Sequence, residues 1–318
     1  MTDWFATEVE EKSDGVASFD RLYGGALLTS PDILPGIRDG RADGGGIPLA
    51  YYAGIMPLVA ITSVPFITSN GRAIMETLNE LYETNEAFRA EFEAQNLHPV
   101  GFTPAIMAGG SKEPITSLSD FEGLNIRAGG FAANVLAHLG ARPVALPAEE
   151  VYEALERGTV NAYASFALDT APSLSVQEVA PHLFNLGIGN FSVQVDAINL
   201  KTWNALPESV QKLMTEVAAA KPQYTMELIA NGTDAACTAY ADAGGEVFTV
   251  SSGDLQRLTN ELRPSLLDAW LDGAVNAGVD RAVAEDFRDE YLAAIERNEA
   301  AFPDEDPLKR CSELAGAR

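Results

Sequence analysis

The sequence predicts an α/β fold in which one long helix connects two parts of the chain. Apolar, β-branched runs alternate with segments of helical period up to about residue 200. The 318 residues, 47% of them apolar, are enough for one large or two ordinary domains with a buried core. Residues 207–244 read as one helical stretch broken only by Pro222 and Asn231-Gly232. Such a stretch exceeds a usual globular helix, so we expect it to bridge two lobes.

The individual elements follow from local periodicity. Helices are expected where apolar residues recur three or four positions apart, over residues 4–12, 72–96, 132–139, 148–157, 170–180 and 208–240. Strands are expected in apolar and β-branched runs, over residues 16–22, 98–107, 124–128, 160–166 and 191–200. The uncharged stretch 44–71 is interrupted by prolines and polar residues, so we interpret it as buried strand and loop instead of a membrane span.

Charge and composition exclude several classes of partner. The chain has 46 acidic and 21 basic residues, a net charge of −25. A surface this acidic repels phosphate backbones and anionic headgroups, so we expect no nucleic-acid partner. The two cysteines form no C-x-x-C motif and the three histidines are scattered. We therefore expect no metal and no cofactor.

The segment from Thr116 to Phe131 carries the strongest chemical signal. It reads as a short capped turn, a strand ending at Arg127, a Gly129-Gly130 bend and then a helix. This order brings the free N–H groups of a helix N-terminus near a guanidinium, and both favour a carboxylate or phosphate. The alternative is that Arg127 pairs with a surface acid and that the two glycines only form a tight turn.

Four motifs in a fixed order extend this signal along the chain. They are D-x-x-G-x-x-I-R at 120–127, L-G-A-x-P-V at 139–144, E-V-Y-x-A-L-x-x-G-x-V at 150–160 and N-x-x-x-W-x-x-L-P at 199–207. Upstream, residues 9–15, residues 34–43, Pro57 and Pro65 fit the same pattern. Together they resemble the DctP-type solute-binding proteins of tripartite ATP-independent periplasmic (TRAP) transporters, over nearly the whole chain.

The resemblance implies a two-lobe, periplasmic binding protein-like fold with a ligand cleft between the lobes. We expect lobe I at 1–104 plus 192–231, lobe II at 105–191 plus 232–300, and a C-terminal tail at 301–318. It also implies a periplasmic monomer that delivers a small organic carboxylate to the small and large subunits of a membrane permease. Family members begin with a signal peptide and a first strand. Neither precedes the helix at Trp4, so we expect an incomplete amino terminus.

The resemblance also implies the ligand-binding residues. In the family, the arginine matching Arg127 forms a salt bridge, usually bidentate, to the ligand carboxylate. The other residues expected at the ligand are Tyr51, Met107, Gly130, Phe131, Ser165, Phe166 and Asn190. Core packing remains the alternative for Tyr51 and Phe166, a solvated strand-end hydroxyl for Ser165, and a turn position for Asn190. Export to an oxidising compartment favours a Cys237–Cys311 disulfide, with two buried free thiols as the alternative.

Departures from the family pattern indicate the type of ligand. Some relatives place a second arginine about twenty residues before the first, and that position here is Met107. Ala164-Ser165 stand where relatives carry larger polar pairs. We therefore expect a monocarboxylate with an apolar or aromatic remainder, held by one strong cation.

Two other functions remain open. One is a ligand-sensing protein that docks on a receptor, and neighbouring permease genes would distinguish transport from it. The other is an enzyme acting on a small organic acid, which turnover assays would reveal. We expect no enzyme, because no nucleophile-elbow, zinc-protease, P-loop or complete dinucleotide-binding motif occurs in the sequence.

Overall fold

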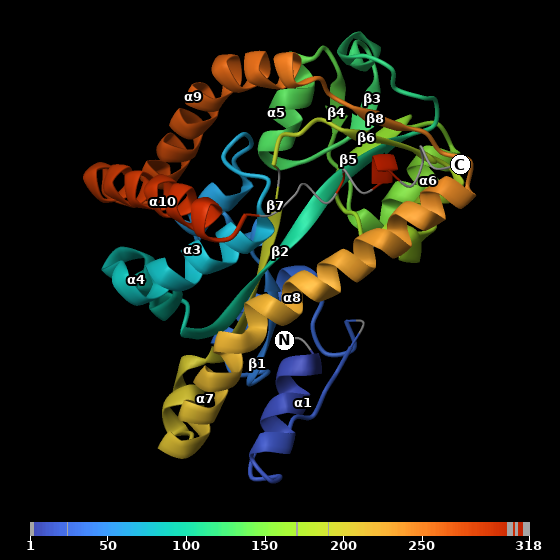
Figure 1. Ribbon diagram of the computed structural model, residues 1–318. Coiled ribbons are helices and arrows are strands. Elements are labelled where there is room, and N and C mark those ends of the chain that lie inside the picture. The colour runs from blue at the N-terminus through green and yellow to red at the C-terminus, as the bar shows by residue number, and fades with distance from the viewer. Residues whose placement is uncertain are drawn as a thin grey trace.

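The computed structural model describes residues 3–23, 25–169, 171–189, 191–303, 308 and 311–313. Within these residues, eight strands form one mixed sheet with the order β1-β7-β2-β5-β3-β4, and β6 joins β2 to β8 (Figure 1). The strands are β1 Gly44–Pro48, β2 Leu97–Ser111, β3 Asn125–Arg127, β4 Arg142–Val144, β5 Ala162–Ala167, β6 His182–Asn185, β7 Phe191–Asn199 and β8 Val247–Thr249.

Helices cover the sheet. The α-helices are α1 Asp3–Lys12, α2 Ile33–Arg38, α3 Gly71–Thr84, α4 Glu86–Ala94, α5 Gly130–His138, α6 Val151–Glu156, α7 Leu200–Ala205, α8 Glu208–Asp242, α9 Ser252–Asn276 and α10 Arg281–Ala301. The 3-10 helices are η1 Ser30–Asp32, η2 Leu49–Tyr52, η3 Val59–Ser63, η4 Leu118–Phe121, η5 Ala148–Glu150, η6 Ala171–Leu174 and η7 Val176–Glu178.

The long strand β2 pairs with strands in both halves of the molecule. Its residues 97–106 pair with β7, which in turn pairs with β1. Its residues 107–111 pair with β5 and β6. The strands β3, β4 and β5 are mutually parallel, whereas the pairs that β2 makes are antiparallel. One continuous strand therefore connects a first half, built on β1 and β7, to a second half, built on β3 to β6.

Each half has its own hydrophobic core. The first core includes Phe88, Phe92, Phe102, Trp270 and Phe287, and the rings of Phe88 and Phe287 stack with centroids 5.2 Å apart. The second core includes Tyr163, Phe166, Leu183, Cys237 and Tyr240. This two-lobe α/β architecture is the fold class that the sequence predicts.

The helices α9 and α10 belong to the first core, which corrects one expected boundary. Residues 232–300 were expected in lobe II, but Leu258 and Trp270 of α9 and Tyr291 of α10 are buried in the first core. The indole Nε1 of Trp270 donates to the Pro57 carbonyl at 2.9 Å. The chain therefore returns from the second half to the first through α9, as Figure 1 shows.

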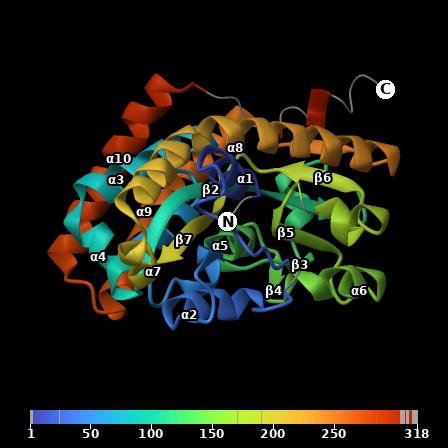
Figure 2. The same ribbon diagram turned by 90° about the horizontal axis from the view of Figure 1, so that it is seen from below.

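The helix α8 runs along both halves, as both views show (Figures 1 and 2), and it confirms the expected bridging helix. Its first part packs against α1, where Val210, Met214 and Val217 meet Phe5 and Val9. Its last part enters the second core through Cys237 and Tyr240. Its 35 residues include Pro222, which is tolerated inside the helix.

Other expectations were wrong or incomplete. Residues 16–22 form no strand, and Val16 and Leu22 are exposed. In place of one helix over 170–180, η6 and η7 flank Ser175, which has a left-handed φ of +55°. The helix over 72–96 divides at Asn85, whose side chain accepts from Phe88 N and begins α4. The prediction placed buried strand in the stretch 44–71 without the bounds of β1, and it had no element at β4, β6, β8, α2, α7, α9 or α10.

The structure shows how the two cysteines are bonded and which elements the uncharged stretch forms. Cys237 and Cys311 form a disulfide with their Cα atoms 4.8 Å apart, so the alternative of two free thiols is wrong. The stretch 44–71 holds β1, η2 and η3, as expected of buried strand and loop. Among the described residues, no helix combines the length and apolar character needed to cross a membrane.

Candidate functional site

Arg127 lies at the carboxyl end of β3, where β3 and β4 end side by side and the parallel strand β5 continues to Ala167. It is in register with Val144 of β4 and with Tyr163 of β5. In open α/β sheets, ligands bind beyond the carboxyl ends of parallel strands, because loops and helix N-termini gather there. The sheet therefore places the strongest candidate residue at the edge where a ligand is expected.

Backbone carbonyls hold the Arg127 guanidinium in one orientation. Its Nε donates to the Leu146 carbonyl at 3.1 Å, and its Nη1 donates to the carbonyls of Ala164 at 3.1 Å and Ser165 at 2.7 Å. Its Cζ lies 5.6 Å from the centre of the Phe166 ring. Three carbonyl oxygens and an aromatic face thus hold the positive charge in place.

The helix α5 begins directly after Arg127. Gly129 precedes its first turn and Gly130 has a φ of +57°, a conformation that glycine adopts at little cost. The first N–H groups of a helix lack intrahelical acceptors and attract anions. Arg127 and the first residue of α5, Gly130, are therefore close together along the chain, as the sequence predicts.

Phe131 places this helix at the boundary between the two halves. It lies in the first turn of α5, and it packs, partly buried, against the first core. Val135, one turn further along, is fully buried in that core. Figure 2 shows α5 near the centre of the molecule, between β7 and β3. Arg127 and Gly130 therefore lie close to the junction of the two halves.

Ser165, Phe166 and Met107 lie on neighbouring strands beside Arg127. Phe166 is 4% exposed, and it both packs in the second core, which was the alternative to a ligand contact, and faces the guanidinium of Arg127. Met107 of β2 is half-buried and pairs with Ala167. The hydroxyl of Ser165 donates to the Gly129 carbonyl at 3.5 Å, which is the outer limit of a hydrogen bond.

Tyr51 and Asn190 complete the set of expected residues. Tyr51 lies on η2 with 55% of its surface exposed, so the alternative of core packing is wrong for it. Its neighbour Tyr52 is buried, and its hydroxyl donates to the Ser30 carbonyl at 2.7 Å. Asn190 lies outside the described residues. The structure thus brings together Arg127, Gly130, Ser165 and Phe166, with Phe131 on the adjoining helix and Met107 one strand further away, on β2.

The main-chain acceptors around Arg127 were not anticipated from the sequence. A carbonyl group is present in every residue, so residue type does not mark Leu146 or Ala164 as guanidinium partners. The available signal was the parallel order of β3, β4 and β5, which places the ends of β3 and β4 beside β5.

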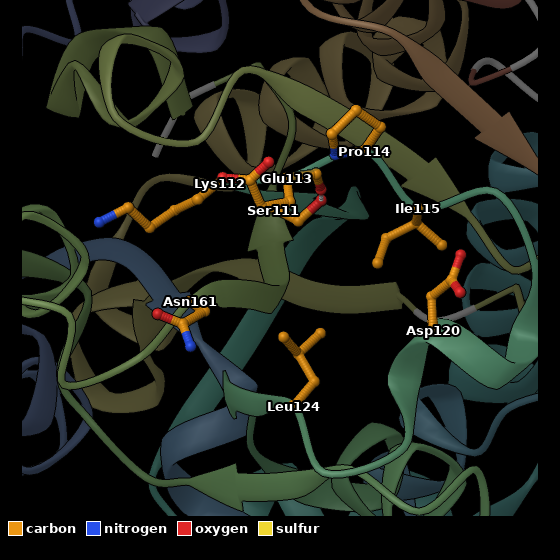
Figure 3. Close-up of a pocket in the computed structure, with 8 residues that line it drawn as sticks. All are labelled: Ser111, Lys112, Glu113, Pro114, Ile115, Asp120, Leu124 and Asn161. Carbon is orange, nitrogen blue, oxygen red and sulfur yellow. Dashed lines mark hydrogen bonds between the residues drawn. The ribbon is translucent and has the colours of Figure 1, made fainter.

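A separate pocket of about 440 Å³ lies at the opposite edge of these strands (Figure 3). Leu124 and Asn161, which precede β3 and β5, form part of its wall, together with Ser111, Lys112 and Asp120. Its charged groups do not converge, because the Lys112 side chain extends away from Asp120 and donates to the Leu155 carbonyl at 2.9 Å. In the part of the chain that the structure describes, no three His, Cys, Asp or Glu side chains are grouped to hold a metal ion.

Sequence comparison identifies the family. The profile of the bacterial extracellular solute-binding protein family 7, DctP, matches residues 2–271. The chain belongs to this family. Its members are periplasmic solute-binding proteins of transporters, and the resemblance found in the motifs is confirmed.

Individual relatives agree with this assignment. The chain is 29% identical over 228 residues to a monocarboxylate 2-oxoacid-binding periplasmic protein of Nostoc sp., a match that covers 70% of this chain and 61% of that protein. It is similar in structure to a TRAP periplasmic solute-binding protein from Desulfovibrio salexigens, with a TM-score of 0.74, 25% identity, and coverage of 94% and 90% of the two chains. A TRAP solute-binding protein from Rhodoferax ferrireducens, in complex with copurified benzoate, has the same fold, with a TM-score of 0.81, 20% identity, and coverage of 93% and 92%.

Proposed function

We propose that this protein is the solute-binding component of a TRAP transporter and that it captures a small organic carboxylate at Arg127. The fixed orientation of the Arg127 guanidinium carries the proposal. A guanidinium already held by three carbonyls loses little freedom when a ligand binds, and its planar fork suits a carboxylate better than a lysine does. The position of α5 at the junction of the halves supports a cleft there.

The ligand is a monocarboxylate with an apolar or aromatic remainder. Met107 stands at the sequence position where some relatives carry a second arginine, Phe166 faces the guanidinium, and Phe131 lies on the helix that follows Arg127. An ionised second carboxylate buried there would be unpaired, which costs several kcal/mol. The Nostoc relative is named for monocarboxylate 2-oxoacids, which fit this description.

The family assignment supports the proposed partners and location. The protein acts as a periplasmic monomer, delivers its ligand to the small and large permease subunits, and turns nothing over. We place residues 1–104, 192–231 and 252–301 in lobe I, because α9 and α10 contribute to the first core. Residues 105–191 and 232–251 form lobe II.

A thermal-shift screen tests the ligand class. The panel contains 4-methyl-2-oxopentanoate, pyruvate and benzoate, with succinate, malate and N-acetylneuraminate as competing classes. A ligand at one hundred times its Kd adds about 2.7 kcal/mol to the unfolding free energy, so binding is visible as a higher Tm. We expect the monocarboxylates to give the larger shifts. Larger shifts with succinate or malate would contradict the proposed class.

A further inference from the structure

The strand β5 contains one extra residue beside Arg127. Ala108 of β2 pairs with Phe166, and Gly110 pairs with Tyr163. Two residues of β5 therefore lie opposite the single residue Gly109, which is the arrangement of a β-bulge. One of the two is Ser165, whose φ of +55° is in the left-handed region that non-glycine residues rarely adopt.

This backbone conformation determines where two carbonyls point. In a regular strand, successive carbonyls point to opposite sides, and the dihedral angles of Ser165 set the angle between the carbonyls of residues 164 and 165. In the left-handed region, adjacent carbonyls point in nearly the same direction, as they do in a helix turn. The structure shows this result, because both carbonyls accept from Nη1 of Arg127, at 3.1 and 2.7 Å.

We propose that Ser165 is a positioning residue whose left-handed backbone aims two carbonyls at Arg127 and so fixes the guanidinium for its ligand. This inference rests on the proposed function of Arg127. The conformation of the main chain carries the effect, because the dihedral angles of residue 165 set the directions of the two carbonyls that accept from Nη1 of Arg127. Suitability for the left-handed region, and not the presence of a hydroxyl, therefore decides which residues work at this position.

Three substitutions at Ser165 distinguish an effect of its backbone conformation from an effect of its hydroxyl. Glycine adopts a positive φ freely and asparagine tolerates it, whereas threonine is β-branched and disfavours it. With 4-methyl-2-oxopentanoate as the probe in calorimetry, we expect S165G and S165N to bind about tenfold more tightly than S165T. A ligand contact through the hydroxyl predicts the reverse order, with S165T the tightest of the three.

Ser175 provides a matched control. It has the same φ of +55°, and its backbone contacts are with Pro172 and Glu178 instead of Arg127. We expect S175T to lower the Tm as S165T does, because both place a β-branched residue in the left-handed region, while its affinity for the probe changes by less than about twofold. A loss of affinity in S175T equal to that in S165T would show that strain acts only through general stability, and it would overturn the proposal.

A measurement on the ligand-free protein separates this inference from the proposed function. NMR reports the rate of rotation about the Nε–Cζ bond of Arg127, which the two carbonyl bonds restrain. We expect faster rotation in S165T than in S165G and S165N. Equal rates in all three would overturn the positioning role. If the original protein failed to bind the probe while the rates differed as expected, the ligand class would be wrong and the positioning role would stand.

Discussion

A buried ion pair connects the bridging helix to the sheet. Nζ of Lys221 on α8 donates to Oδ2 of Asp196 on β7 at 2.6 Å, and both side chains are almost fully buried. Burial by itself would raise the pKa of Asp196, but the adjacent ammonium holds this pKa below its usual value. Gly101 of β2 leaves room for the lysine, since a Cβ there would lie 2.7 Å from its Cδ. A larger residue at 101 would push the lysine away from its partner.

Replacing Lys221 with methionine tests how much this pair contributes. The substitution removes the ammonium of Lys221 from the buried Asp196 carboxylate, and breaking a buried pair in this way costs about 3–5 kcal/mol of unfolding free energy. Urea denaturation measures the loss. K212M on the same helix removes an exposed lysine and should change stability by less than about 0.5 kcal/mol. Equal stabilities for the two variants would contradict the assigned role of the pair.

At the scale of residues, the sequence predicted the positive charge of Arg127 at the site but not the carbonyl groups that surround it. Arg127 stood out because an arginine before Gly-Gly at a helix start is a chemical pattern that can be read from residue types. The carbonyls of Leu146, Ala164 and Ser165 could not be predicted, because their directions depend on the β5 bulge. A bulge arises from pairing between distant segments, and one strand alone does not reveal it.

One carboxylate fixes the start of η3 to α4. The Glu91 carboxylate accepts from the backbone N–H groups of Leu58, at 2.7 Å, and Val59, at 3.1 Å. These donors are the N–H groups that the first turn of a helix leaves without partners. Burial raises the pKa of Glu91 to about 7, although the two N–H groups act in the opposite direction.

The raised pKa of Glu91 predicts a specific dependence of stability on pH. Between the ordinary pKa of 4.5 and the folded value of about 7, the folded state binds more protons than the unfolded state. The contribution of Glu91 to stability is therefore present at low pH and is lost as the pH rises through 7. In E91Q this titration is absent, so the stability of the original protein relative to E91Q should fall by roughly 2 kcal/mol between pH 5 and pH 8.

Urea denaturation at the two pH values checks this expectation. E83Q, which removes an exposed carboxylate from the neighbouring helix α3, is the matched control. The control should follow the original protein at both pH values. A constant difference between E91Q and the original protein across the range would rule out the titration.

At the scale of elements, local signals predicted some segments well and failed where tertiary contacts decide. The helices α1 and α8 follow their apolar periodicity closely. Residues 16–22 have the composition of a strand. A strand also needs a neighbouring strand to accept and donate its backbone hydrogen bonds, and β7 pairs with β1 instead of with this segment. Strand was expected in the stretch 44–71, but the bounds of β1 were not predicted because it begins with three glycines, which have low strand propensity. The helices α9 and α10 did carry readable signals, because Ser251 and Asp280 cap their first turns.

At the scale of the whole molecule, the C-terminal part of the chain contacts both halves. The Asn70 side chain at the start of α3 donates to the Phe302 carbonyl at 2.7 Å, which fixes the end of α10 to the first half. Leu308 and Cys311 are instead buried in the second core, and the disulfide bonds Cys311 to Cys237 of α8. The bond closes a loop of 74 residues in sequence that includes α9 and α10.

Removing this disulfide should destabilise the protein measurably. In the chain-entropy account, a cross-link over a loop of this size contributes about 2–5 kcal/mol by restricting the unfolded chain. We expect the double variant C237S/C311S to lose stability by that amount in urea. A reducing agent should lower the Tm of the original protein toward that of the double variant and leave the variant unchanged. No effect of the reductant on the original protein would contradict the account.

The calorimetric Kd of Arg127 variants tests the central claim most directly. The ligand is the acid that gives the largest shift in the thermal screen, and the proteins compared are the original chain, R127A, R127K and the exposed-arginine control R157A. A charge-assisted contact in a closed site is worth roughly 2–5 kcal/mol, so R127A should lose at least about thirtyfold in affinity, R127K should recover part of it, and R157A should bind normally. An unchanged Kd in folded R127A would contradict the claim that this guanidinium binds the carboxylate.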